Sequence, residues 1–134
     1  MIAVRFWIPL LLAQSGYPAT WQGGSGTELL IRAKVLIHHG VSAADAEALR
    51  QAKTLLDSAG RDHRMVPLVH YYRGYIDYHF AVSVERMQKE RAGTYLDSAV
   101  RNLEAAIAAD KGFAEAYALL ASCYGLKTAL TPLK

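Results

Sequence analysis

Cysteine and proline are scarce in this chain: its 134 residues include one cysteine and four prolines. A single cysteine cannot form a disulfide within the chain, so a disulfide-stabilised scaffold is excluded. It also leaves no cysteine pair for a metal site or a covalently attached haem. The one cysteine, Cys123, lies in an apolar stretch, where we expect a small buried hydrophobic side chain rather than a reactive thiol.

The chain also has little net charge and no alternating run of β-branched residues after its N-terminus. Its formal net charge is +3, and its basic residues form no cluster, so we expect no nucleic-acid partner. Hydrophobic residues make up 52% of the sequence, which argues against disorder. The length suits one domain, and the missing alternation predicts an all-α fold.

Motifs that specify a reaction are missing as well. The sequence contains no GxSxG nucleophile motif, no HExxH zinc motif and no CxxCH haem motif. Its five histidines are His38, His39, His63, His70 and His79. His70 and His79 are nine positions apart rather than four, so they do not share a helical face. We therefore expect no catalytic activity, no metal and no cofactor, with a histidine-based metal or haem carrier as one alternative.

The N-terminal segment 1–20 is predicted to be a secretory signal peptide. Arg5 precedes an apolar run at 6–13, and the small residues Ser15 and Gly16 follow it, which is the layout of such a signal. The run is too short to span a bilayer. We expect a periplasmic or secreted protein with no membrane span in the mature chain, or a cytoplasmic protein if the segment is not a signal peptide.

A glycine-rich linker, WQGGSG at 21–26, is predicted to precede a helical domain at 27–134. Ser25, followed three residues later by Glu28, is typical of a capping box at the start of a helix. The linker lacks the lysine and the preceding strand of a phosphate-binding loop. It is therefore interpreted as a connection and not as a binding site.

The first helix is predicted at 27–39 and is expected to end at Gly40. Ser42 with Asp45 is a second Ser-x-x-acid signature, which predicts the start of another helix that ends at Gly60. Because only a short connection joins the two helices, they must lie antiparallel.

A middle helix is predicted at 66–87. It is apolar on two faces, which is typical of a helix packed on two sides. A charged stretch at 82–93 overlaps the end of this helix. Thr94 with Asp97 is predicted to cap the next helix.

The stretch 96–124 predicts two more helices, joined at 110–112. Gly112 is expected to adopt the left-handed conformation that ends a helix. The apolar stripe of the first helix contains Leu96, Ala99, Leu103, Ala106 and Ile107. That of the second contains Tyr117, Leu120, Ala121 and Tyr124. The chain is thus expected to form about five helices.

An internal repeat links the two halves of the helical region. The pattern Ala-x-x-x-Leu-x-x-Ala occurs twice, and the copies are 47 positions apart, counted from Ala52 to Ala99. The two copies are Ala52, Leu56 and Ala59, and Ala99, Leu103 and Ala106. Counted from the last alanine of each copy, a small residue follows 15 positions later: Gly74 after Ala59, and Ala121 after Ala106. We expect Leu56 and Leu103 to be buried between helices at equivalent places.

The stretch 96–124 resembles the tetratricopeptide (TPR) repeats. The residues similar to the first helix of a TPR are Tyr117, Leu120, Ala121 and Tyr124. The residues similar to the second helix of the preceding repeat are Ala99, Leu103 and Ala106. The sequence departs from the family at Ala121, where glycine is usual, and at Lys111, where proline is usual.

The resemblance implies an all-α solenoid of antiparallel, TPR-like helix hairpins, either complete or the N-terminal part of a longer array. The period of 47 residues exceeds the ~34 of a TPR and reaches the ~40–47 of HEAT and armadillo repeats, which are the alternative architecture. The excess lies at 82–93, where it can lengthen one helix and its loop without changing the helix junction.

The resemblance also implies a non-catalytic scaffold for protein–protein interactions. In TPR proteins the first helix of each pair lines a concave groove that holds partner peptides. The candidate partner-binding residues are Tyr71, Arg73, Tyr75 and Tyr78, because tyrosines can stack on and hydrogen-bond an extended ligand. The same tyrosines could instead fill the space between helices. A second hypothesis is an accessory segment of a larger exported enzyme or transport assembly.

The last helix, predicted at 113–126, has apolar residues on more than one face. Packing against 99–107 can cover only one of these faces. We therefore expect either further repeats after this helix or self-association, in which the open C-terminal helix pairs with another copy of the chain.

Overall fold

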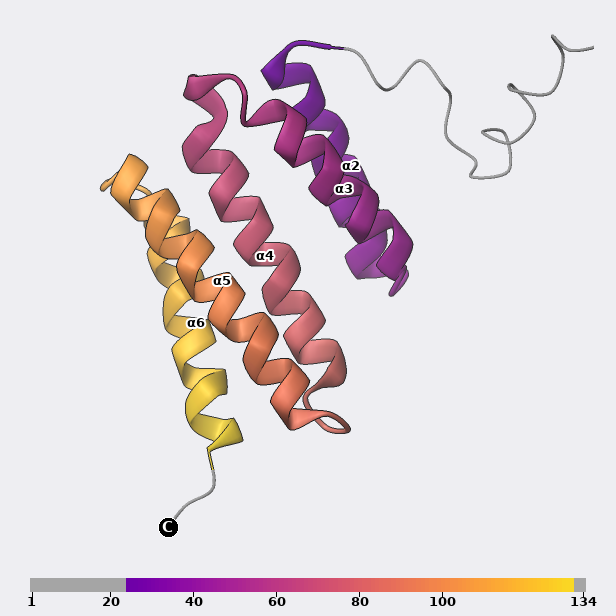
Figure 1. Cartoon of the computed structure of the whole chain (residues 1–134), viewed down its shortest axis with the longest axis vertical. Helices are drawn as coiled ribbons and strands as arrows, with labels where there is room; N and C mark the ends of the chain where they lie inside the picture. Colours follow the sequence, from indigo (N-terminus) through magenta and orange to yellow (C-terminus); the bar gives the residue numbers. More distant parts are fainter. Residues whose placement is uncertain (1–23, 132–134) are drawn as a thin grey trace, which may run out of the picture.

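The computed structural model describes residues 24–131, so the predicted signal peptide and most of the linker lie outside the described residues. The elements are α2 (Gly26–Ser42), α3 (Ala46–Ala59), the short 3₁₀ helix η3 (His63–Met65), α4 (Val66–Val84), α5 (Lys89–Ala109) and α6 (Ala114–Leu130). Consecutive α-helices pack as antiparallel neighbours (Figure 1). The described part of the chain has no strand, and the predicted all-α fold of about five helices is confirmed.

The first helix, α2, begins where its cap predicts but ends later than expected. Ser25 is the N-cap, and its hydroxyl oxygen accepts a hydrogen bond from the Glu28 amide at 3.3 Å. Gly26, predicted to belong to the linker, is already helical. Gly40 does not end the helix but lies buried within it, where an added Cβ would be 2.6 Å from Leu49 Cδ2. Gly40 therefore permits close packing of α3 on α2.

The turn from α2 to α3 depends on Ala44 and Asp45 rather than on Ser42. Ala44 has a φ of 53°, and the Asp45 amide donates to a carbonyl in the last turn of α2 at 2.9 Å, as in a Schellman helix end. The Asp45 carboxylate then accepts from the Glu47 and Ala48 amides at 3.0 and 3.1 Å. Asp45 is thus the N-cap of α3, and the predicted capping role of Ser42 is wrong.

The connection between α4 and α5 is shorter than predicted. α4 ends at Val84 rather than at residue 87, and α5 begins at Lys89. Thr94 was expected to cap α5 but lies inside it, where its hydroxyl donates to the Glu90 carbonyl at 3.2 Å. Much of the extra repeat length therefore forms the first turns of α5.

The turn between α5 and α6 is held by a side chain. Asp110 accepts a hydrogen bond from the Gly112 amide at 2.9 Å, which closes the turn as Asp residues commonly do. Gly112 does not have a positive φ, so its predicted left-handed conformation is wrong.

Two apolar clusters form the core, and α4 contributes to both. Leu56 belongs to the cluster built from α2, α3 and α4, whereas Leu103 belongs to the one built from α4, α5 and α6. Both leucines are 0% exposed, which confirms their predicted burial. The alanines of the two patterns are also fully buried, namely Ala52, Ala59, Ala99 and Ala106. The prediction that the middle helix packs on two sides is confirmed.

The helices α4 and α5 approach each other closely at Gly74. A Cβ atom there would lie 2.8 Å from Leu103 Cγ and 3.2 Å from the Ala99 carbonyl oxygen. This close approach repeats the arrangement of Gly40 and Leu49 between α2 and α3. In both helix pairs a leucine of the second helix packs over a glycine of the first.

Only part of the predicted apolar stripe of α6 packs on the core: Leu120 is partly buried against the second apolar cluster, and the Tyr124 hydroxyl donates to the Glu104 carboxylate of α5 at 3.3 Å. Tyr117 and Tyr124 are 48% and 47% exposed, and Ala121 between them is exposed. The side packed in the core contains Ala116 and Cys123, both 0% exposed. Helical periodicity identified an apolar side of α6, but the buried side is rotated toward Ala116 and Cys123 and shares only Leu120 with the predicted stripe.

Replacing Leu103 with alanine should lower the free energy of unfolding by ~2–5 kcal/mol, because removing a fully buried leucine leaves a cavity. Urea unfolding followed by circular dichroism measures this change. The control is Tyr117→Ala, which removes a half-exposed side chain and should cost less than ~1 kcal/mol. A Leu103→Ala protein that unfolds at the wild-type urea concentration would show that the leucine is not part of the core.

Candidate functional site

Three tyrosines and a histidine lie together on one side of α4. Tyr71, Tyr75 and Tyr78 are spaced by four and three residues, which places them on one helical face. The Tyr71 and Tyr75 ring centroids are 6.3 Å apart. The His79 ring is 4.5 Å from that of Tyr75 and 5.7 Å from that of Tyr78. We call these four residues the α4 aromatic face.

The residues of the α4 aromatic face are partly buried and keep some accessible surface. Tyr71 packs on Phe113, with ring centroids 4.9 Å apart. Tyr75 packs against the first apolar cluster and Tyr78 against the second. Burial raises the pKa of the Tyr71 hydroxyl, which therefore remains a hydrogen-bond donor at neutral pH. The tyrosines thus fill space between helices and also present an aromatic surface.

Arg73 does not belong to this face, although it was predicted to act with the tyrosines. It lies two residues after Tyr71, or about 200° around the helix. Its guanidinium pairs with the Asp57 carboxylate of α3. The structure therefore places Arg73 where it holds α4 to α3, away from the tyrosine rings.

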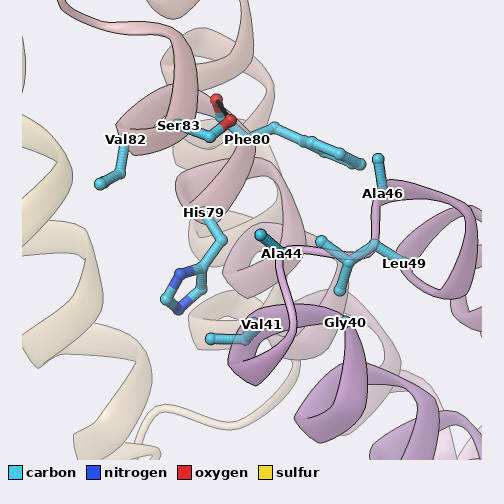
Figure 2. A pocket seen from close by; sticks show the side chains of 9 residues that line it. All are labelled: Gly40, Val41, Ala44, Ala46, Leu49, His79, Phe80, Val82 and Ser83. Carbon is cyan, nitrogen blue, oxygen red and sulfur yellow. Dashed lines mark hydrogen bonds between the residues drawn. The ribbon is translucent and has the colours of Figure 1, made fainter.

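A hollow of about 210 Å³ lies beside His79, between the α2–α3 turn and the C-terminal part of α4 (Figure 2). Most of the residues that line it are apolar. They are Gly40, Val41, Ala44, Ala46, Leu49, His79, Phe80, Val82 and Ser83. The Ser83 hydroxyl donates to the Phe80 carbonyl at 2.7 Å, so its proton is already engaged.

His79 is the main polar group at the edge of this hollow, and Figure 2 shows its ring near Val41. Burial lowers the pKa of its imidazole, so the ring is neutral at pH 7 and can both donate and accept a hydrogen bond. From the sequence, His79 was predicted only as one of several possible metal ligands. Its position four residues after Tyr75, which puts both rings on one helical face, is the signal for its place beside the tyrosines.

Among the described residues, two of the other histidines have polar neighbours and the cysteine is buried. No cluster of three or more His, Cys, Asp or Glu residues that could hold a metal occurs within 24–131. His39 pairs with Asp45 at 3.4 Å, and His70 Nδ1 lies 3.4 Å from Asn102 Oδ1. Burial raises the pKa of the Cys123 thiol to about 11, so it is protonated at neutral pH, as a structural cysteine is.

Asp77 is a buried carboxylate with two partners. Asp77 lies on α4, and its side chain is buried in the core of the protein, where the residue is 1% exposed. Lys53 Nζ of α3 lies 2.5 Å from Oδ1, and the Ser98 hydroxyl of α5 donates to Oδ2 at 2.7 Å. Because both oxygens are engaged, we assign Asp77 a structural role. An aspartate in an apolar helix is the signal in the sequence that could have predicted such a buried contact.

Replacing Asp77 with alanine should lower the free energy of unfolding by ~1.5–3 kcal/mol, because hydrogen bonds to a buried charged group are lost. The matched control is Asp57→Ala, which breaks the more exposed pair with Arg73 and should cost less than ~1 kcal/mol. Urea unfolding of both variants makes the comparison. Equal midpoints for the two variants would mean that the buried contact does not stabilise the fold.

Comparisons of this chain with protein-family models, with curated proteins and with solved structures found no match. None of the helices in residues 24–131 is long and apolar enough to cross a membrane. The fold and the site therefore define the class of protein only broadly, as an all-α protein of antiparallel helices with an aromatic face on its central helix.

Proposed function

We propose that this protein is a non-catalytic scaffold for protein–protein interactions, built as a TPR-like solenoid, and that a partner segment binds along the α4 aromatic face. The observation that supports this most directly is the α4 aromatic face itself, whose His79 lines an apolar hollow. The repeated pattern around Leu56 and Leu103 supports the solenoid, since both copies are buried between successive helix pairs.

The chemistry of the face suits an extended, largely uncharged segment. The tyrosine rings offer flat apolar surface and hydroxyl groups, a combination that is common at protein interfaces. The hollow of about 210 Å³ is smaller than the roughly 300–1,000 Å³ of pockets for drug-sized ligands. It suits one apolar side chain of a partner, whose backbone could then hydrogen-bond to the neutral His79 ring.

Val82→Lys tests this proposal, because Val82 lines the hollow and is 41% exposed. A lysine there would have to lose its hydration when an apolar side chain binds, while its charge remains compatible with the C-terminal part of a helix. We expect at least a tenfold loss of captured partner when tagged protein is incubated with a periplasmic extract and bound proteins are quantified by mass spectrometry.

The control is Met87→Lys, which adds the same charge at a residue that is 88% exposed and outside the hollow. It should capture the same proteins as wild type. Circular dichroism checks that both variants are folded. Equal capture by wild type and Val82→Lys would show that the partner does not use the hollow beside His79 and would contradict this mode of binding.

We also propose that the protein is exported, on the evidence of the signal-peptide layout at 1–20. Expression of the full chain in a bacterial host should yield a mature protein whose first residue lies between Gln14 and Thr20. Mass spectrometry of the purified protein measures this directly. Recovery of intact chain that still begins at Met1 and remains in the cytoplasm would contradict export.

A further inference from the structure

A second hollow, of about 260 Å³, lies where the end of α3 passes through η3 into α4. Its lining combines aliphatic side chains, among them Val66 and Val69, with the guanidinium groups of Arg61 and Arg73. It shares no lining residue with the hollow beside His79. We call it the arginine hollow, and it is a separate feature of the surface.

The arginine hollow has one positive charge more than its own acidic group can balance. Asp57 also lines it and pairs with Arg73, which still has further N–H donors because a guanidinium carries five. Arg61 is exposed, and its side chain forms no ion pair or hydrogen bond with any residue in 24–131. Two arginines and one aspartate therefore leave a single positive charge without a partner.

The other polar features of the arginine hollow do not change this balance. His70 lines it, but its Nδ1 lies 3.4 Å from Asn102 Oδ1 and so has a partner. The hollow adjoins both the C-terminal end of α3 and the N-terminal end of α4, whose opposite dipoles offset each other. The arginine side chains thus supply the charge.

We propose that the arginine hollow binds a small aliphatic carboxylic acid in its ionised form. The carboxylate accepts hydrogen bonds from Arg61 and Arg73, since the planar fork of a guanidinium matches the geometry of a carboxylate. The alkyl chain lies on Val66 and Val69, where it is removed from water.

Charge and size both select this class of ligand. One unpartnered positive charge balances a monoanion, whereas a phosphate dianion would bring a negative charge that nothing in the hollow balances. The volume of about 260 Å³ is below the roughly 300–1,000 Å³ of pockets for drug-sized ligands, so the acid is a small one. Gly60 keeps the space beside Val69 open, because a Cβ there would lie 3.5 Å from Val69 Cγ1.

The test titrates hexanoate into the full chain labelled with ¹⁵N and follows the amide chemical shifts by NMR. We expect saturable shifts centred on the residues that line the arginine hollow. Acetate retains the carboxylate without the chain, and hexan-1-ol retains the chain without the carboxylate. Both should bind at least fivefold more weakly than hexanoate.

Three substitutions examine the parts of the site. Arg61→Gln removes the unpartnered charge and should weaken hexanoate binding at least fivefold. Gly60→Leu fills the hollow without a change of charge and should weaken it similarly; the φ of −67° at this position suits any residue. Asp57→Asn removes the group that competes for Arg73 and should tighten binding at least threefold, a gain that no loss of folding can produce.

Two matched controls should bind hexanoate within twofold of wild type. Arg86→Gln removes the same charge at an exposed residue outside the arginine hollow. Val82→Lys alters the other hollow, so this proposal and the proposed partner surface on α4 succeed or fail independently. Circular dichroism establishes that every variant is folded.

Three results would overturn the proposal. The first is the absence of saturable shifts at the arginine hollow. The second is that Arg61→Gln binds hexanoate as tightly as wild type, or that acetate binds as tightly as hexanoate. The third is at least tenfold tighter binding of N-acetyl-leucine than of hexanoate, which would assign the hollow to the C-terminus of a peptide instead of to a free acid.

Discussion

The buried carboxylate of Asp77 is the contact on which the arrangement of this protein depends. It accepts hydrogen bonds from Lys53 of α3 and Ser98 of α5, and so joins three helices at one point. The two apolar clusters of the core both include residues of α4, and apolar packing alone is not directional. A hydrogen-bonded charge is directional, so Asp77 sets the rotation of α4 between its neighbours.

That rotation decides which residues of α4 remain accessible. Gly74 is held against α5, and Arg73 is held toward α3 by its ion pair with Asp57. With those sides of the helix occupied, the tyrosines and His79 lie on another side, and His79 lines the hollow at the α2–α3 turn. The aromatic face is therefore a consequence of how α4 packs, and it needs no flexible loop to position it.

Cys123 and Asp77 both have structural roles in the core. The Cys123 thiol is buried and protonated, since burial raises its pKa to about 11, and the carboxylate of Asp77 is engaged on both oxygens. The surfaces that the described residues present to solvent include the aromatic face on α4 and the exposed side of α6, where Tyr117 and Tyr124 are 48% and 47% exposed. The proposed partner segment would bind along the first of these surfaces.

Helical periodicity by itself predicted the all-α fold and the burial of Leu56 and Leu103, because spacing shows which residues share one side of a helix. It could not show which neighbour covers that side. Gly40 was therefore expected to end a helix, although it lies in a close helix contact. Arg73 was predicted to act with the tyrosines, but its guanidinium pairs with Asp57 of α3. Tyr117 was expected to pack against a neighbouring helix, but it is 48% exposed. Only the tertiary structure decides such pairings, because they depend on the relative rotation of helices that are distant in sequence.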